Sequence, residues 1–288
     1  MRLTKHHGLG NDFLVAMVDS LPEDASARAR EVCHRTRGVG ADGLLWGLPG
    51  DPAMGTDATM VLFNADGTRA EMSGNGIRCL AQAIVESGHD GVAQAIVESG
   101  HDGVSQAIVE SGHDGVLRIG TDAGVRTVWI EATEDRGMIR ARVDMGPIGP
   151  GPELASIDYS GGLRFMTVEV GNPHLVVEVA DAGSMNVSWD GYELSRAAGG
   201  INVEFVSRRA GDQGIDMRVW ERGVGETQAC GTGACAAAHA AQEWGLVDGR
   251  EVSVFMLGGE VVVELDETAV LTGPAVRIAT IDHGGNNG

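Results

Sequence analysis

Lysine is almost absent from this chain. Lys5 is the only lysine in 288 residues, although lysine and arginine together number 21. An enzyme that depends on pyridoxal phosphate needs a lysine to form a Schiff base with that cofactor, and a single lysine beside the N-terminus is a poor candidate. If the protein acts at the α-carbon of an amino acid, we therefore expect it to work without a cofactor.

Long apolar runs and an excess of positive charge are also missing. No apolar run approaches the roughly 18 residues that a membrane span needs, and the opening stretch M-R-L-T-K-H-H-G lacks the apolar segment of a secretory signal. The formal net charge is −20, and so acidic a surface repels nucleic acid and anionic lipid. We expect a cytoplasmic protein with neither nucleic acid nor a membrane as its partner.

The four cysteines form no paired motif. There is no C-x-x-C pair and no set of cysteine and histidine at zinc-finger spacing, so we expect no metal site. Without a secretion signal we expect no disulfide either. Cys33, Cys79 and Cys235 are interpreted as small buried apolar residues. Cys230 differs, because a glycine follows it where a helix is expected to start.

The length and composition predict two globular domains. A chain of 288 residues, 43% hydrophobic and 22% charged, suits two domains of ordinary size. A stretch rich in proline and glycine, 146–152, indicates the boundary. We expect an N-terminal domain over 1–146, a C-terminal domain over 147–272, and a returning strand and tail over 273–288.

Apolar periodicity and turn residues predict the elements within each half. Helices are expected over 22–36, with acidic residues in the first turn, from about Ile77, and over 234–243. Strands are expected within 3–18, 44–46, 59–63, 116–145, 166–179, 201–206, 215–220 and 251–279, with a loop over 221–228.

Two landmarks recur in the second half at nearly the same offset. G-N-D-F-L-V at 10–15 resembles G-N-P-H-L-V at 171–176, which lies 161 residues later. S-G-N-G at 73–76 resembles C-G-T-G at 230–233, which lies 157 residues later. This agreement indicates an ancient duplication. Each half then supplies one glycine-rich turn that leads into a helix N-terminus, and a pseudo-two-fold arrangement would let both N-termini face one cleft.

A second repeat, of 12 residues, occupies 81–92, 93–104 and 105–116. The unit is too short for a solenoid, and its glycines break the helical face. One copy is enough to finish a helix and turn into the next strand. We therefore expect 24 surplus residues, held as short helical turns at the surface at little cost in loop entropy. Its His-Asp pairs are interpreted as turn chemistry and not as a metal site; the histidines are His89, His101 and His113.

The paired glycine-rich turns indicate a chemistry. A helix N-terminus presents N–H groups and a partial positive charge, so it can bind a carboxylate and lower the pKa of a cysteine at the same place. Two such turns around one amino acid could flank its α-carbon on both faces. One side chain would remove the α-proton, and the other would return a proton to the opposite face. The alternative is a pair of helix caps with no catalysis.

Several longer motifs resemble those of the diaminopimelate epimerase family. They are N-D-F (11–13), F-N-A-D-G (63–67), G-N-G-I-R-C (74–79), G-N-P-H (171–174), E-R-G-V-G-E-T-Q-A-C-G-T-G-A-C (221–235) and T-G-P-A (272–275). The resemblance implies an α/β fold of two pseudo-symmetric domains, each a curved, mostly antiparallel sheet wrapped around a central helix, with the active site in the cleft between them. It also implies cofactor-independent epimerisation of LL-2,6-diaminopimelate to the meso form, for lysine and peptidoglycan synthesis.

The resemblance implies roles for individual residues as well. The catalytic positions are Cys230, Ser73, His174 and Glu221. The positions for substrate binding are Asn11, Asn64, Gly74, Asn75, Asn172, Asn202, Glu221, Arg222, Gly231 and Thr232. In this scheme the turn amides bind the reacting carboxylate, Arg222 binds the distal carboxylate through a bidentate contact, and Glu221 faces an ammonium group. Gly43 falls where many members of the family have a glutamine ligand.

Ser73 is the main departure, because it stands where the family usually has its other catalytic cysteine. A hydroxyl is far less acidic than a thiol and is a weak base unless a neighbour activates it. Three alternatives follow: an epimerase in which Ser73 relays protons, a Ser/Cys dehydratase or racemase of a proline-type amino acid, or an amino-acid-binding homologue with impaired turnover. The residues kept for the distal end of the substrate favour diaminopimelate; they are Asn64, Asn202, Glu221 and Arg222. The expected partner is a small amino-acid substrate, and association into a homodimer is left open.

Overall fold

A computed structural model describes residues 1–87, 115–135, 137–154, 157, 159–211 and 214–284. The chain divides into two compact units: Met1–Val143 with Gly273–Gly288, and Asp144–Thr272. Most of the 12-residue repeat, including its three histidines and the surplus residues expected at the surface, lies outside the described residues. Within the described ranges, no helix is long and apolar enough to cross a membrane.

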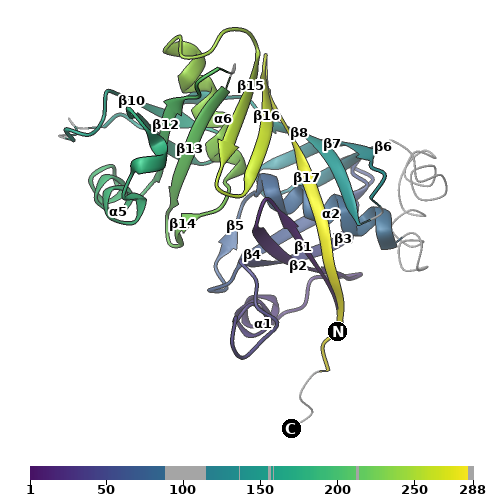
Figure 1. The fold of residues 1–288 in the computed structure, drawn as a ribbon. Coiled ribbons are helices and arrows are strands. Elements are labelled where there is room, and N and C mark those ends of the chain that lie inside the picture. Colours follow the sequence, from purple (N-terminus) through teal and green to yellow (C-terminus); the bar gives the residue numbers. More distant parts are fainter. Residues whose placement is uncertain (88–114, 136, 155–156, 158, 212–213, 285–288) are drawn as a thin grey trace. The chain divides into compact units, whose positions relative to one another are not determined.

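The first unit is built mainly from antiparallel strands (Figure 1). Its elements are β1 (Arg2–Gly8), β2 (Asn11–Met17), α1 (Ala25–Val32), β3 (Gly43–Pro49), β4 (Ala58–Asn64), β5 (Arg69–Ala70), α2 (Gly74–Ser87), β6 (Gly115–Thr121), β7 (Gly124–Ala132), β8 (Met138–Gly146) up to Val143, and β17 (Ala269–Asp282) from Gly273 onward. β2 pairs with β3 and β4 with β6 in parallel, whereas the β1–β2, β3–β4, β6–β7 and β7–β8 pairs are antiparallel. β17 pairs with both β1 and β8, which closes the series of strands into a ring.

The helix α2 packs against strands around this ring. It contacts β1, β2, β3, β4 and β7. Its buried side chains include Ile77, Cys79, Leu80 and Ile84, which lie on more than one face of the helix. A helix that is apolar nearly all round is stable only when it is enclosed, so the sequence G-I-R-C-L-A-Q-A-I-V specifies a central helix and not a surface one.

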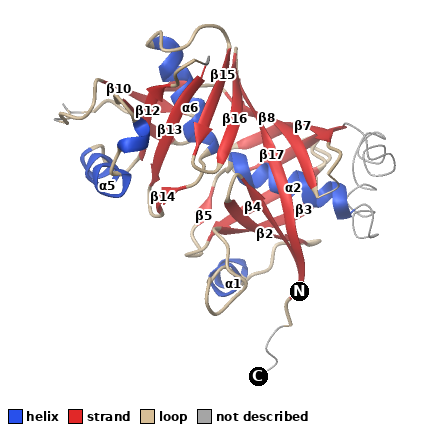
Figure 2. Ribbon diagram, in the orientation of Figure 1, coloured by secondary structure: helices blue, strands red, loops and turns tan. Residues whose placement is uncertain are grey.

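The second unit repeats this order of elements, and it too consists of strands with few helices (Figure 2). Its elements are β9 (Gly149–Pro150), β10 (Arg164–Glu169), β11 (Pro173–Glu178), the 3-10 helix η1 (Ala182–Ser184), α5 (Val187–Ala197), β12 (Asn202–Arg208), β13 (Gly214–Glu221), β14 (Gly225–Thr227), α6 (Gly231–Glu243), β15 (Glu251–Met256), β16 (Gly259–Leu265) and the start of β17. β11 pairs with β12 and β13 with β15 in parallel, while β10–β11, β12–β13, β15–β16 and β16–β17 are antiparallel. The sequence of parallel and antiparallel pairs is the same as in the first unit.

The helix α6 occupies the corresponding place in the second unit. It contacts β10, β11, β12, β13, β15 and β16. Nearly all of its residues from Gly231 to Ala241 are buried, and most of them are alanine or glycine. Side chains this small let the surrounding strands approach the helix backbone closely, and alanine has the highest helix propensity. The composition therefore fits a tightly enclosed helix.

Several expected boundaries are wrong. The helices expected from Ile77 and over 234–243 begin three residues earlier, at Gly74 and Gly231. The glycines that were expected to form turns before the helices lie in the first turn of each helix instead. The reason is that the preceding residue, Ser73 or Cys230, caps the helix. The loop expected over 221–228 contains β14, which returns along β13 after positive-φ glycines at 223 and 225.

The helix expected over 22–36 is also shorter, at Ala25–Val32, and no acidic residue lies in its first turn. The chain folds back at its end, where the carbonyl of Val32 accepts hydrogen bonds from the amides of Val39 and Gly40. Asp24 takes the N-cap position without a side-chain capping bond and instead pairs with Arg28. The helix α5 was not expected from the sequence.

Candidate active site

Cys230 lies at the N-cap of α6. Its Sγ accepts a hydrogen bond from the amide of Gly233 at 3.4 Å and lies 3.5 Å from the Thr232 hydroxyl. The residue is 6% exposed, and Gly231 and Thr232 beside it are buried as well. The side chain therefore sits at the positive end of an enclosed helix, with a backbone N–H pointing at the sulfur.

Ser73 takes the same position at α2. Its Oγ accepts a hydrogen bond from the amide of Gly76 at 3.0 Å, which is again the third residue after the capping one. Serine is among the most favourable N-cap residues. Ser73 is half-buried, and the next two residues, Gly74 and Asn75, are buried. A hydroxyl and a sulfur thus perform one structural role in the two units.

The pKa of the Cys230 thiol is raised well above its ordinary value, contrary to the expectation that the helix N-terminus lowers it. Burial is the largest cause, followed by the negative charges of Glu221 and Glu204. The hydrogen bonds from Thr232 and from the Gly233 amide act in the opposite direction but are outweighed. In the ligand-free protein the sulfur is therefore held as a thiol.

His174 is fully buried and is oriented by two side chains. Its Nδ1 lies 2.7 Å from Oε1 of Glu204, and its Nε2 lies 3.2 Å from Oδ1 of Asn172. Glu204 was missed by the sequence analysis. The signal that could have found it is an acidic residue inside the apolar strand I-N-V-E-F-V, where a buried charge requires a partner.

The strand ends of the second unit gather the remaining predicted residues. His174 on β11 pairs in register with Asn202 on β12. The Asn202 side-chain carbonyl accepts a hydrogen bond from the Arg222 amide at 2.9 Å, and Glu221, at the end of β13, accepts a hydrogen bond from Thr227. Arg222 is exposed, with its guanidinium 3.4 Å from the carbonyl of Gly200.

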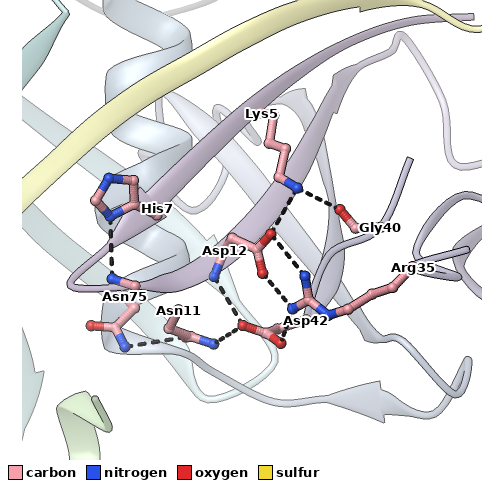
Figure 3. A network of polar contacts seen from close by, with 9 residues as sticks. Lys5, His7, Asn11, Asp12, Arg35, Gly40, Asp42 and Asn75 are labelled. Carbon is pink, nitrogen blue, oxygen red and sulfur yellow. Dashed lines mark hydrogen bonds and ion pairs between the residues drawn. The ribbon is translucent and has the colours of Figure 1, made fainter. Parts of the chain in front are cut away.

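In the first unit, Asn11 and Asn75 contact each other directly (Figure 3). The Asn75 amide donates to Asn11 Oδ1 at 3.1 Å, and the Asn11 amide donates to Asp42 at 2.9 Å. Buried Arg78 donates to Asn75 Oδ1 at 2.7 Å and to the carbonyls of Gly74 and Pro274. Arg78 therefore fixes the turn that precedes it, a role that the sequence analysis did not foresee.

A charged network supports Asn11 from the other side (Figure 3). Asp12 is bound by Lys5 at 2.8 Å and by Arg35 at 2.8 Å, and Arg35 also binds Asp42 at 2.7 Å. Burial alone would raise the pKa of Asp12, but hydrogen bonds from Arg35 and Lys5 outweigh it and lower the pKa. Asp12 is thereby held charged, and Asp42 is a fixed acceptor for Asn11.

Asn64 and Gly43 lie opposite each other, where β3 pairs with β4. The Asn64 amide donates to the Thr68 hydroxyl at 3.0 Å, within the turn that follows β4. A side chain at residue 43 would lie 2.9 Å from the carbonyl oxygen of Phe63 and 3.3 Å from the Phe13 ring. A glutamine at this position would therefore require the backbone to shift.

Each unit thus groups its own predicted residues. The first brings Asn11 and Asn75 together, with Gly74 tied to them through Arg78. The second unit groups the residues His174, Asn172, Cys230, Gly231, Thr232, Glu221, Asn202 and Arg222 around the ends of three strands and the start of α6. Among the described residues, no group of three or more acidic, histidine or cysteine side chains could hold a metal ion.

The sequence is similar to curated proteins over nearly its whole length. The family described as "Diaminopimelate epimerase" matches residues 3–148 and 166–278. The protein of that name from Moorella thermoacetica is 37% identical over 290 residues, which is 96% of this chain and 97% of the relative. The one from Pelotomaculum thermopropionicum is 38% identical over 302 residues, again 96% of this chain and 97% of the relative.

Solved structures share the fold at low sequence identity. A probable proline racemase from Agrobacterium radiobacter K84, solved with bound carbonate, has a TM-score of 0.73 at 17% identity and covers 99% of this chain and 93% of its own. A hydroxyproline epimerase from Agrobacterium vitis, with bound trans-4-hydroxy-L-proline, has a TM-score of 0.67 at 17% identity, with 99% and 91% covered. These likenesses show a mixed α/β fold with a barrel-forming sheet and few helices.

Proposed function

Because this chain belongs to the diaminopimelate epimerase family, we propose that it converts LL-2,6-diaminopimelate to the meso form by proton transfer at the α-carbon, without a cofactor. The enzyme is an isomerase of amino-acid biosynthesis, in the route to lysine. The observation that carries the mechanism is that Ser73 and Cys230 occupy the same capping position, each at the start of an enclosed helix.

The two capping side chains act on opposite faces of one α-carbon. The Cys230 thiolate takes the α-proton, the substrate keeps the electron pair as a carbanion, and the Ser73 hydroxyl delivers its own proton to the other face. This leaves a Cys230 thiol and a Ser73 alkoxide, and proton exchange through water then restores the starting thiolate and hydroxyl. The first-turn amides of Gly74, Asn75, Gly231 and Thr232 bind the reacting carboxylate, since N–H groups at a helix start stabilise negative charge. His174 and Glu221 assist this proton transfer at the Cys230 face.

The other end of the substrate is recognised by polar side chains from the strand ends. Arg222 is exposed and offers a bidentate contact for the distal carboxylate, and Glu221 offers a charge for an ammonium group. Asn64 and Asn202 complete this set, while Asn11 and Asn172 are further residues for substrate binding. A second amino-acid head group distinguishes diaminopimelate from most other amino acids, so these contacts determine the choice of substrate.

The matching strand order supports a duplicated architecture. We assign the two epimerase-like domains to 1–146 and 147–272, with 273–288 as a strand and tail that return to the first. The same succession of parallel and antiparallel pairs, with one enclosed helix in each half, is what a duplicated and pseudo-symmetric pair of domains requires. The proposed mechanism requires residues of both domains to reach one substrate.

Incubation with LL-diaminopimelate in deuterated water tests this proposal. Formation of the meso product with deuterium at one α-carbon is the expected result. Exchange without inversion would mean that only one face has a working base, which contradicts the two-base mechanism. Binding without exchange would make the chain an amino-acid-binding homologue with impaired turnover.

A second candidate is a dehydratase or racemase that uses a Ser/Cys pair on a proline-type amino acid. The pairing of Ser73 with Cys230, on a fold shared with a hydroxyproline epimerase, favours it. Glu221 and Arg222 count against it, because a proline-type substrate has no second amino-acid head for them to bind. Turnover of trans-4-hydroxy-L-proline but not of LL-diaminopimelate would establish this alternative.

A further inference from the structure

Glu204 is a buried acidic residue to which the family resemblance gives no role. It lies on β12, between residues with apolar side chains, and is 0% exposed. Removing a carboxylate from water costs several kcal/mol unless partners compensate. The strand would be more stable with an apolar residue at this position, so the presence of the carboxylate needs an explanation.

The surroundings of Glu204 connect it to both reactive side chains of the second unit. Its Oε1 is 2.7 Å from Nδ1 of His174. A methyl group on Gly233 would lie 2.5 Å from that same oxygen and 3.2 Å from Sγ of Cys230. The carboxylate oxygen and the sulfur can therefore be no farther apart than the sum of those two distances. Within the described part of the chain, Oε2 of Glu204 is buried without a hydrogen-bond partner.

The contacts of His174 fix the position of its protons. An ionised carboxylate only accepts hydrogen bonds, so Nδ1 of His174 carries a hydrogen toward Glu204. Nε2 faces Asn172 Oδ1 at 3.2 Å. The Nδ1–H···Oε1 hydrogen bond therefore holds the ring in one orientation.

We propose that Glu204 is a positioning residue: it holds the His174 ring in place, and its charge keeps the Cys230 sulfur as a thiol until the substrate binds. Glu221, from the end of β13, adds a second negative charge near the sulfur. The catalytic meaning of this inference rests on the proposed function. A substrate ammonium group bound at Glu221 neutralises one of the two charges, so the Cys230 thiol gives its proton to water more readily and leaves the thiolate that takes the α-proton.

Titration of the Cys230 thiol in the ligand-free enzyme tests the proposal. Thiolate ultraviolet absorbance is followed against pH for the wild type and for Glu204→Gln, each corrected by its Cys230→Ser counterpart. Glu204→Gln keeps an acceptor for His174 but removes the charge, so the thiolate fraction at a fixed pH below the midpoint should rise about tenfold, or one pKa unit. Glu204→Asp should stay close to the wild type.

Glu178→Gln is the matched control, because Glu178 is another buried carboxylate of the second unit, on β11, whose partner is Arg164. It should leave the Cys230 titration unchanged. An unchanged midpoint in folded Glu204→Gln overturns the proposal. If that variant does not fold, Glu204→Met takes its place, because it removes the charge and suits the apolar neighbours on the strand: the midpoint should again fall, and an unchanged midpoint overturns the proposal.

The titration needs no substrate, so it separates this inference from the proposed function. If diaminopimelate is epimerised but the midpoint of the Cys230 titration does not move, only the proposed role of Glu204 is disproved. If the midpoint moves but no substrate exchanges its α-proton, the proposed function falls. In an active enzyme, Glu204→Gln should also lower kcat and move its pH profile with little change in KM, a pattern that loss of packing alone would not produce.

Discussion

Ser73 and Cys230 differ by one atom in a shared structural setting, since each accepts the N–H of the third residue along its helix. Serine is a good helix cap, so the stability of the two helix starts does not require sulfur in one turn and oxygen in the other. The difference is chemical: a hydroxyl gives up its proton far less readily than a thiol. The asymmetry of the two turns therefore predicts asymmetric proton transfer at the two faces of the substrate.

Ser73→Cys should raise the rate of epimerisation. A thiol can alternate between acid and base near neutral pH, and a positioned acid–base group typically contributes 100-fold or more, so we expect kcat to increase about tenfold or more. The measurement is the rate of meso-diaminopimelate formation. Ser73→Ala is the control: it removes both the hydroxyl and the cap, so it should lose activity and about 1 kcal/mol of stability. No gain in Ser73→Cys would contradict the placement of Ser73.

Gly233→Ala should damage the site although it adds only one methyl group. That group would lie 2.5 Å from Glu204 Oε1 and 3.2 Å from the Cys230 sulfur, so the carboxylate must move away from His174. Displacement of a catalytic group by about 1 Å can cost about 100-fold in rate. We expect a large fall in kcat.

The matched control for Gly233→Ala is Gly149→Ala, on β9 of the same unit. Its added methyl group would have nothing within 4 Å, so its kcat should equal that of the wild type. Similar losses in the two variants would mean that close approach at Gly233 is not the cause.

The elements show which interactions could be predicted from the sequence. The strands of both halves could be predicted from the sequence because their apolar and β-branched runs are long. The helix starts are misplaced, because S-G-N-G and C-G-T-G resemble turns until the capping contacts are known. β14 is missed because its three residues pair only with β13 and carry no apolar pattern of their own. Local sequence does not encode pairings of this kind.

Arg78 shows how a single side chain holds one element in place. It lies on α2 and donates to Gly74, Asn75 and Pro274, so it links the first turn of the helix to the returning strand. Arg78→Met should lower the free energy of unfolding by about 3 kcal/mol, because buried acceptors lose their donor. Arg78→Lys should recover little of this loss, since an ammonium group cannot reproduce the planar fork of donors.

Urea unfolding measures the effect of Arg78 substitution. Arg28→Met is the control, because Arg28 forms an exposed ion pair with Asp24 one turn away on α1. Exposed pairs of this type contribute only a few tenths of a kcal/mol, so this variant should be almost as stable as the wild type. Equal losses in both variants would show that the buried contacts of Arg78 do not stabilise the start of α2.

For the whole molecule, the family and its chemistry could be predicted from motifs. The residues that hold the site residues in place could not be predicted in this way. Asn11, Asn75 and His174 were predicted as site residues because they lie in motif stretches. Arg78 lies inside such a motif, and Glu204 lies in a strand, yet neither role was foreseen. Both act through partners distant in sequence: Pro274 lies 196 residues from Arg78, and His174 lies 30 residues from Glu204. Such contacts become visible only when the strands are in register.

The pH dependence of stability depends on a buried histidine that the reaction does not use. His6, on β1, is 0% exposed and lies 3.0 Å from Gln82 and 2.8 Å from Thr4. Burial is the largest cause that lowers its pKa from 6.5 to about 4. The unfolded chain therefore binds a proton in this range that the folded protein does not. Stability from this source is complete above pH 6.5 and is lost as the pH falls toward 4.

Denaturant unfolding between pH 7 and pH 4 should show this loss directly, with His6 contributing roughly 3 kcal/mol at most. His6→Asn keeps a polar group near Gln82 but has no imidazole to protonate, so its stability should fall less steeply over the same range, even if it is lower at pH 7. If His6→Asn has the wild-type slope, the acid sensitivity must come from other groups, because only the difference in protons bound by the folded and unfolded states can change the slope.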